Sequence, residues 1–154
     1  MRDIFLISIV LIMAILALKR PWIGIMLWTW LGIMNPHRYT FGIAYSAPLA
    51  AIAVAVTMIG LMYTKERESP VKGTEVKIFI LFIVWITLSW LFGFDLENDY
   101  EQWKKVMKVD LMILVALALL HTKKHILALA WVAAGSLALL GAKGGLYTLS
   151  TGGG

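Results

Sequence analysis

The stretch "GIAYSAPLAAIAVAVTMIGLMY" (Gly42 to Tyr63) decides the fold class of this chain. It contains no charged residue, and a helix needs about 20 predominantly apolar residues to cross a hydrocarbon core about 30 Å thick. A polar segment with several basic residues, "TKERESPVKGTEVK" (Thr64 to Lys77), follows it directly. We therefore predict a membrane-spanning helix over 42–63, followed by a loop at the membrane surface.

The rest of the 154-residue chain has a similar composition. Hydrophobic residues make up 60% of it, the mean hydropathy is +0.82, and the 15% of charged residues are bunched between apolar runs. A soluble domain needs a larger polar share to cover its surface. The sequence predicts an all-α, polytopic integral membrane protein, with about six transmembrane helices and short loops in one domain over 1–154.

The transmembrane helices are expected at about 4–18, 22–34, 42–63, 78–94, 106–120 and 126–142. A tight hairpin is expected between the first two, because one continuous helix would place Lys19 and Arg20 inside the bilayer. Glu101 and Lys105 stand four residues apart in the stabilising order, so a helix is expected to begin near Tyr100. The N-terminal run lacks a small-x-small cleavage site, which favours a retained span over a signal peptide.

Basic residues set the expected orientation, because cytoplasmic loops carry an excess of Lys and Arg. Lys19-Arg20, the 64–77 loop and Lys123-Lys124 are expected in the cytoplasm. The Asn35–Phe41 turn, the Asp95–Lys108 loop and the C-terminal tail are then expected outside.

The net charge of +5 and the pI of about 9.6 do not indicate a nucleic-acid partner. The basic residues lie at the ends of apolar runs, where loops meet anionic headgroups, so the expected partner is the lipid bilayer. Cysteine is absent, which excludes disulfides, a thiolate nucleophile and a cysteine metal site.

A turn with unusual polarity, "NPHRY", follows the second apolar run. Pro36 disfavours a helical conformation of Asn35, which places His37 and Arg38 at the membrane surface. Arg38 can simply reach a lipid headgroup. Alternatively, His37 and Arg38 belong to a binding surface for a lipid-linked diphosphate, since guanidinium binds phosphate with two parallel hydrogen bonds. The residues alone leave both interpretations open.

Lys143, Gly144 and Gly145 also allow two interpretations. Glycines let backbone N–H groups approach a phosphate while a lysine supplies charge, although the full phosphate-binding loop of nucleotide hydrolases is missing. The other interpretation is the C-terminal cap of the sixth span, with a left-handed glycine.

Two further groups invite a metal interpretation. Asp95, Glu97 and Asp99 alternate, but they lack the glycine and distal Glu of a Ca²⁺-binding loop, so a solvated outer loop is expected. His121 and His125 are four residues apart, but two ligands make an incomplete site, so they are expected at the membrane surface. The sequence predicts neither a metal site nor a cofactor.

Asp110 is an acid inside an apolar run, where ionisable groups are costly and often functional. It comes two residues after Lys108, which favours a place at the membrane surface. Tryptophans near span ends are expected to form an aromatic belt rather than a sugar-stacking surface; they are Trp22, Trp28, Trp30, Trp85, Trp90 and Trp103.

Four motifs resemble the N-terminal part of the O-antigen ligase and polymerase superfamily. They are "MRDIFL" (1–6), "KRPWIGIMLWTWLGIMNPHRYTFGIAYSAP" (19–48), "YEQWKKVMKVDLMIL" (100–114) and "GAKGGLYTLSTGG" (141–153). Within that superfamily the chain in particular resembles the O-glycosylation ligases associated with the exosortase A system. The candidate binding residues taken from matches to the subgroup's motif positions are His37, Arg38, Lys143, Gly144 and Gly145.

The resemblance implies a multi-pass protein of the bacterial cell inner membrane. It implies an enzyme that moves a preassembled saccharide from undecaprenyl diphosphate to an acceptor on the periplasmic side. Family members continue into further spans and a periplasmic loop that carries their essential residues, so the expected partner is a missing C-terminal part, and residues 1–154 alone are expected to be inactive. The alternatives are a noncatalytic scaffold of a polysaccharide export or sorting system and a small transporter subunit.

Overall fold

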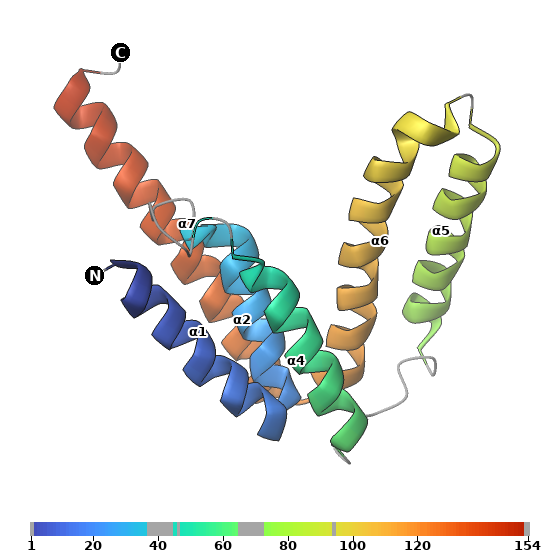
Figure 1. Ribbon diagram of the computed structural model, residues 1–154, viewed down its shortest axis with the longest axis horizontal. Helices are drawn as coiled ribbons and strands as arrows, with labels where there is room; N and C mark the ends of the chain where they lie inside the picture. Colours follow the sequence, from blue (N-terminus) through green and yellow to red (C-terminus); the bar gives the residue numbers. More distant parts are fainter. Residues whose placement is uncertain (1, 37–44, 46, 65–72, 94, 153–154) are drawn as a thin grey trace. The chain divides into compact units, whose positions relative to one another are not determined.

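The computed structural model describes residues 2–36, 45, 47–64, 73–93 and 95–152, which form helices and no strand (Figure 1). These helices are α1 (Arg2–Lys19), α2 (Pro21–Met34), α4 (Leu49–Tyr63), α5 (Thr74–Leu91), α6 (Leu96–Leu119) and α7 (Lys123–Thr151). The chain divides into two compact units. One contains α1, α2, α4 and α7, and the other contains α5 and α6. The expected all-α class is confirmed.

The first two helices form the expected tight hairpin. Arg20 alone separates them, with an extended backbone at φ −136° and ψ 88°. Pro21 then occupies the first turn of α2, where its missing N–H costs no helical hydrogen bond. At the other end of α2, Asn35 adopts a left-handed conformation at φ 46°, and its N–H donates to the Leu31 carbonyl at 3.1 Å. This cap ends α2 directly before Pro36.

Small residues let the helices of the first unit approach closely. A Cβ atom at Gly24 of α2 would overlap the Thr57 hydroxyl of α4 and lie 3.3 Å from the Ala17 Cβ of α1. Thr57 is fully buried, and its hydroxyl donates to the Ala53 carbonyl at 2.6 Å. The hydroxyl therefore has a partner within its own helix, which is how small and hydroxyl residues allow tight packing in an apolar surrounding. α2 contacts α1, α4 and α7, and α1 also contacts α4.

Large apolar side chains form a second contact region in the same unit. Leu6 and Val10 of α1 pack with residues of α2 and α4. Their buried partners are Leu27, Leu31, Leu49 and Ala53. The α1–α2–α4 arrangement is thus fixed by close backbone contact at one place and by aliphatic packing at another.

Three helix boundaries differ from the sequence prediction. The span predicted over 42–63 is not one continuous helix, because α4 begins at Leu49 after Pro48. A proline lacks the N–H for a helical hydrogen bond and disfavours helix in the residue before it. α6 begins at Leu96 rather than near Tyr100, with Glu97 and Asp99 in its first turn, where acidic side chains interact favourably with the helix dipole. α7 continues beyond residue 142 to Thr151.

Among the described residues, two helices, α5 and α7, are long and apolar enough to cross a membrane. Both leave large apolar side chains exposed, as shown by Leu81 at 68%, Trp85 at 68% and Trp131 at 76%. The surface helix of a soluble protein confines such residues to the stripe that faces its core. α2 and α4 are apolar but shorter, with 14 and 15 residues.

Candidate functional site

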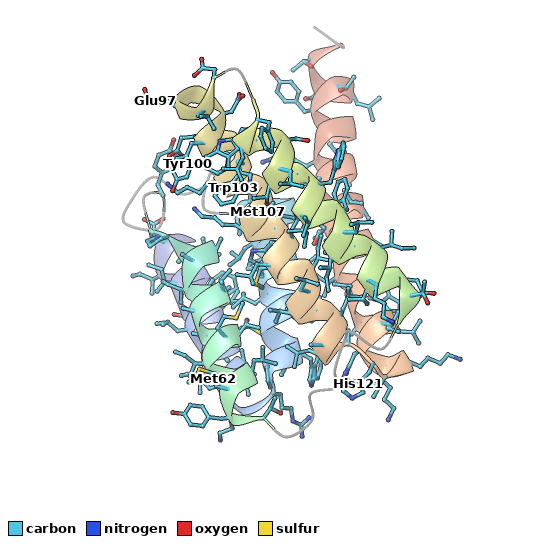
Figure 2. All side chains as sticks on the ribbon, turned by 90° about the vertical axis from the view of Figure 1, so that its right-hand side faces the viewer. Met62, Glu97, Tyr100, Trp103, Met107 and His121 are labelled. Atoms are coloured by element: carbon cyan, nitrogen blue, oxygen red, sulfur yellow. The ribbon has the colours of Figure 1, made fainter. Side chains whose placement is uncertain are left out.

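Three aromatic rings gather where α5 turns into α6, and we call Trp90, Tyr100 and Trp103 the aromatic cluster. The indole rings of Trp90 and Trp103 stack with their centroids 4.6 Å apart and their planes 22° apart. The Tyr100 ring lies 5.8 Å from Trp90 and 5.9 Å from Trp103. Figure 2 shows Tyr100 and Trp103 following one another along α6. Each distance is in the range where aromatic pairs attract beyond their apolar burial.

Hydrogen bonds hold the two indoles in place. The Trp90 Nε1–H donates to the Leu96 carbonyl at 3.3 Å, across the turn between the two helices. The Trp103 Nε1–H donates to the Thr87 hydroxyl at 3.4 Å, and that hydroxyl donates to the Ile83 carbonyl at 2.9 Å. Since both indole N–H groups have partners in this hairpin, the rings have a defined orientation.

Charged side chains border the cluster. The Lys104 Nζ lies 5.4 Å from the centre of the Tyr100 ring and 3.2 Å from a carboxylate oxygen of Glu101. Glu101 and Lys104 are well exposed, with side-chain fractions of 65% and 41%. Tyr100 is itself 43% exposed. The hairpin thus presents an accessible aromatic ring beside a cation and a carboxylate.

A family model covers the whole chain, matching residues 1–154. The chain belongs to a family of unknown function, DUF5935. No curated protein and no solved structure matches it. Membership in DUF5935 assigns no activity, so the chemistry of the chain has to be argued from its own residues.

In this DUF5935 chain, the predicted residues Lys143, Gly144 and Gly145 lie inside α7 and are exposed. The predicted helix end at these residues is wrong, because the cap lies at Gly152, which is left-handed at φ 70° and donates its N–H to the Thr148 carbonyl. The backbone N–H groups of Gly144 and Gly145 point along the helix toward carbonyls one turn earlier. They therefore do not form an open loop that binds phosphate. The charged group at this place that attracts an anion is the ammonium of Lys143.

His37 and Arg38 lie outside the described residues of the DUF5935 chain, so their role stays a prediction. The neighbouring residue Asn35 is described, and its left-handed cap directs the chain out of α2. The described residues therefore do not place His37 and Arg38 beside Lys143.

The two predicted surface histidines lie near the N-terminal end of α7, with His125 in its first turn and His121 two residues before the helix begins. The Thr122 hydroxyl accepts from the His125 backbone N–H at 3.4 Å and caps the helix. The His125 ring stacks on Trp22 of α2, with centroids 4.6 Å apart and planes 19° apart. His125 therefore packs α7 against α2. Among the described residues, no group of three His, Asp or Glu side chains is placed to hold a metal ion.

Asp110 lies in the middle of α6 and is buried, with 6% exposure. Its Oδ2 has no hydrogen-bond partner among the described residues. This burial is against other residues of the chain, so the expected place of Asp110 at the membrane surface stays a prediction.

The aromatic cluster itself was not predicted, because the tryptophans were assigned to a membrane belt. The available signal was the spacing of Tyr100 and Trp103, which places both rings on one side of a helix that starts six residues after Trp90. Predicting that Trp90 meets these two rings also required knowing that α5 and α6 form a hairpin.

Proposed function

We propose that this chain is the N-terminal membrane portion of a glycan ligase of the O-antigen ligase type. It would take part in moving a preassembled saccharide from undecaprenyl diphosphate to an acceptor on the periplasmic side of the bacterial inner membrane. The four motifs that resemble this superfamily support the proposal, and they are distributed from residue 1 to residue 153.

The structural observation that supports it is the aromatic cluster. A sugar ring presents C–H groups that are attracted to the negative face of an aromatic ring. Its hydroxyls need hydrogen-bond partners, which Glu101 and Lys104 offer beside the exposed Tyr100. The cluster is thus proposed to hold the saccharide while the bond to diphosphate is broken.

The proposal includes a topology with six membrane spans. The basic residues place the 64–77 loop in the cytoplasm, which puts the turn between α5 and α6 on the periplasmic side. The two helices that flank this turn fit that orientation, because the charged residues of α5, Glu75 and Lys77, lie at its far end within the 64–77 segment, while α6 begins with acidic residues. The aromatic cluster then lies on the side of the membrane where the transfer takes place.

In this proposal, Arg38 and Lys143 supply charge to the leaving diphosphate. Transfer of the saccharide breaks the bond between the sugar C1 and the phosphate oxygen, and the diphosphate leaves with the electron pair. The acceptor hydroxyl oxygen bonds to C1, and its proton is taken up by the released diphosphate. Cations near the leaving group lower the barrier because negative charge develops there. His37 is assigned to the same surface by its position in the sequence.

Deleting the gene in its bacterium tests the function directly. We expect the acceptor to lose its glycan and undecaprenyl-linked glycan to accumulate, as measured by gel mobility and by mass spectrometry of extracted lipids. Tyr100→Ala should lower transfer roughly two- to tenfold, the effect of one aromatic contact. The matched control is Tyr147→Ala, an exposed tyrosine on α7. Unchanged glycan attachment after gene deletion would refute the proposal.

A further inference from the structure

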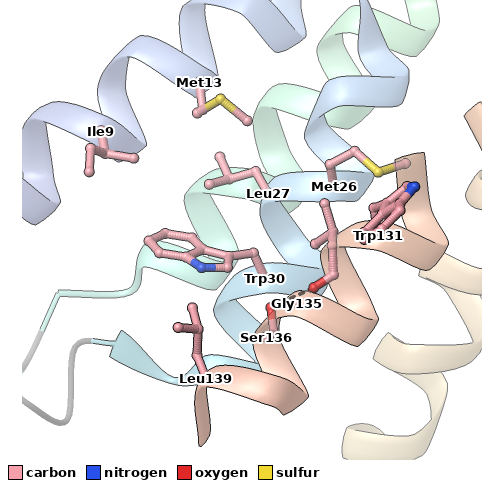
Figure 3. A pocket seen from close by; sticks show the side chains of 10 residues that line it. Ile9, Met13, Met26, Leu27, Trp30, Trp131, Gly135, Ser136 and Leu139 are labelled. Atoms are coloured by element: carbon pink, nitrogen blue, oxygen red, sulfur yellow. Dashed lines mark hydrogen bonds between the residues drawn. The ribbon is translucent and has the colours of Figure 1, made fainter. Parts of the chain in front are cut away.

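A pocket of about 300 Å³ lies between α1, α2 and α7 in the first unit. Its walls come from all three helices, and Figure 3 shows their side chains around one space. The pocket is open to the outside, since two of its lining residues, Trp131 and Leu139, are 76% and 59% exposed. Residues that line it include Met13, Leu27, Trp30, Trp131, Ser136 and Leu139.

The lining of this pocket suits hydrocarbon rather than water. Apart from the indoles of Trp30 and Trp131, its polar side chain is Ser136, whose hydroxyl donates to the Val132 carbonyl at 2.7 Å. At about 30 Å³ per molecule roughly ten waters would fill the pocket, and its walls offer them few polar partners. Ten methylene groups of similar size need no such partners.

A cation lies one turn beyond the pocket on the same helix. The α7 residues that line the pocket are Trp131, Val132, Gly135, Ser136 and Leu139. Lys143 follows Leu139 by four residues and therefore continues this stripe, about 6 Å further along the axis. Side chains on a helix lean toward its N-terminus, which tilts Lys143 back toward the pocket.

We propose that this pocket binds one acyl chain of an anionic phospholipid, with the lipid phosphate held at Lys143. The apolar walls accept the chain, and the lysine supplies the complementary charge at the distance of a headgroup. The pocket is at the small end of the range for ligand sites, about 300 to 1,000 Å³, so it holds part of one chain. This inference shares Lys143 with the proposed transfer site, but lipid binding is measured without transfer, because a lipid bound here need not react.

Gly135 offers a way to fill the pocket without disturbing the helix. A Cβ atom at Gly135 meets no atom within 4 Å, so a leucine side chain has open space there. Gly141 is a matched control, because it lies on the same helix with the same open surroundings but does not line the pocket. Both substitutions add the same residue type to α7, and circular dichroism should show equal helix content.

The test titrates the purified chain in detergent with phosphatidylglycerol and counts bound lipids by native mass spectrometry. We expect one lipid to remain bound to the unaltered chain and to Gly141→Leu, and Gly135→Leu to bind about tenfold more weakly because part of the chain is excluded. Lys143→Met should remove the preference for phosphatidylglycerol over phosphatidylcholine with the same chains. Equal binding by all the variants would overturn the proposal, as would a preference for polyprenyl phosphate over phosphatidylglycerol.

A measurement on the unaltered chain does not depend on how the variants fold. Phosphatidylglycerol with brominated acyl chains should quench tryptophan fluorescence, because Trp30 and Trp131 line the pocket. We expect the quenching to saturate at one lipid per chain, above any linear background from the micelle. Quenching that rises without saturation would contradict a specific site.

Discussion

Gly60 lies where α4 crosses the turn between α1 and α2. A Cβ atom here would lie 2.7 Å from the Ala17 carbonyl oxygen and 3.3 Å from the Pro21 Cβ. Both neighbours are held by the hairpin, and a backbone oxygen cannot move away as a flexible side chain can. Single atoms at such positions therefore decide how closely whole helices approach.

We predict that Gly60→Ala destabilises the chain by about 1–3 kcal/mol, the usual cost of inserting a methyl group into a tightly packed site. Thermal unfolding in detergent, followed by circular dichroism, measures this change. Gly141→Ala is the control, since a Cβ at Gly141 meets nothing within 4 Å. If Gly60→Ala unfolded at the same temperature as the control, the close contact between α4 and the α1–α2 turn would be disproved.

At the scale of the element, α7 is the helix that departs furthest from its expected length. It has 29 residues and is therefore about 44 Å long, longer than the hydrocarbon core of about 30 Å. Its second half contains Gly144 and Gly145, which weaken a helix because they lose more backbone freedom on folding than other residues. The hydroxyl of Thr148 donates to the Gly144 carbonyl at 3.0 Å, a local bond within the helix.

We predict that replacing both Gly144 and Gly145 by alanine stabilises α7, by about 0.5–1 kcal/mol for each residue. No Cβ contact opposes the change, because neither position has an atom within 4 Å. Hydrogen exchange of the backbone amides from Lys143 to Thr151 should become slower. Faster exchange, or a loss of helix content, would contradict the prediction. It would mean that these glycines adopt a backbone conformation that alanine disfavours.

At the scale of the whole molecule, the arrangement of charge around apolar helices fixes the expected orientation. Along the sequence, the 64–77 segment with its basic residues precedes most of α5, and the acidic start of α6 follows it. One of them must face the cytoplasm if α5 crosses the membrane, as its length and composition allow. The absence of native cysteine makes this testable with single introduced thiols.

We predict that cysteines introduced at Ser69 and at Asn98 react oppositely with an impermeant thiol reagent in spheroplasts. Asn98→Cys should be labelled in intact cells, because the basic 64–77 loop is retained in the cytoplasm. Ser69→Cys should be labelled only after lysis. The same reactivity of both thiols in intact spheroplasts would contradict the proposed topology.

The sequence by itself determined the helical class and the approximate place of the apolar runs. The first two runs, 4–18 and 22–34, lie inside α1 and α2, and Arg20 separates the two helices while Pro21 begins α2, as expected. These features depend on hydrophobicity, chain length and the missing N–H of proline, which are properties of neighbouring residues. The same local rule, applied to Pro48, would have located the start of α4.

Only the tertiary structure decided which residues meet. Gly24 lies against Thr57, and Trp90 stacks on Trp103, although each pair is separated by more than ten residues. The hydrophobic effect has no direction, so an apolar run does not specify its partner. Helix pairing depends on the fit of small residues and rings across two surfaces, and that fit exists only once the chain has folded.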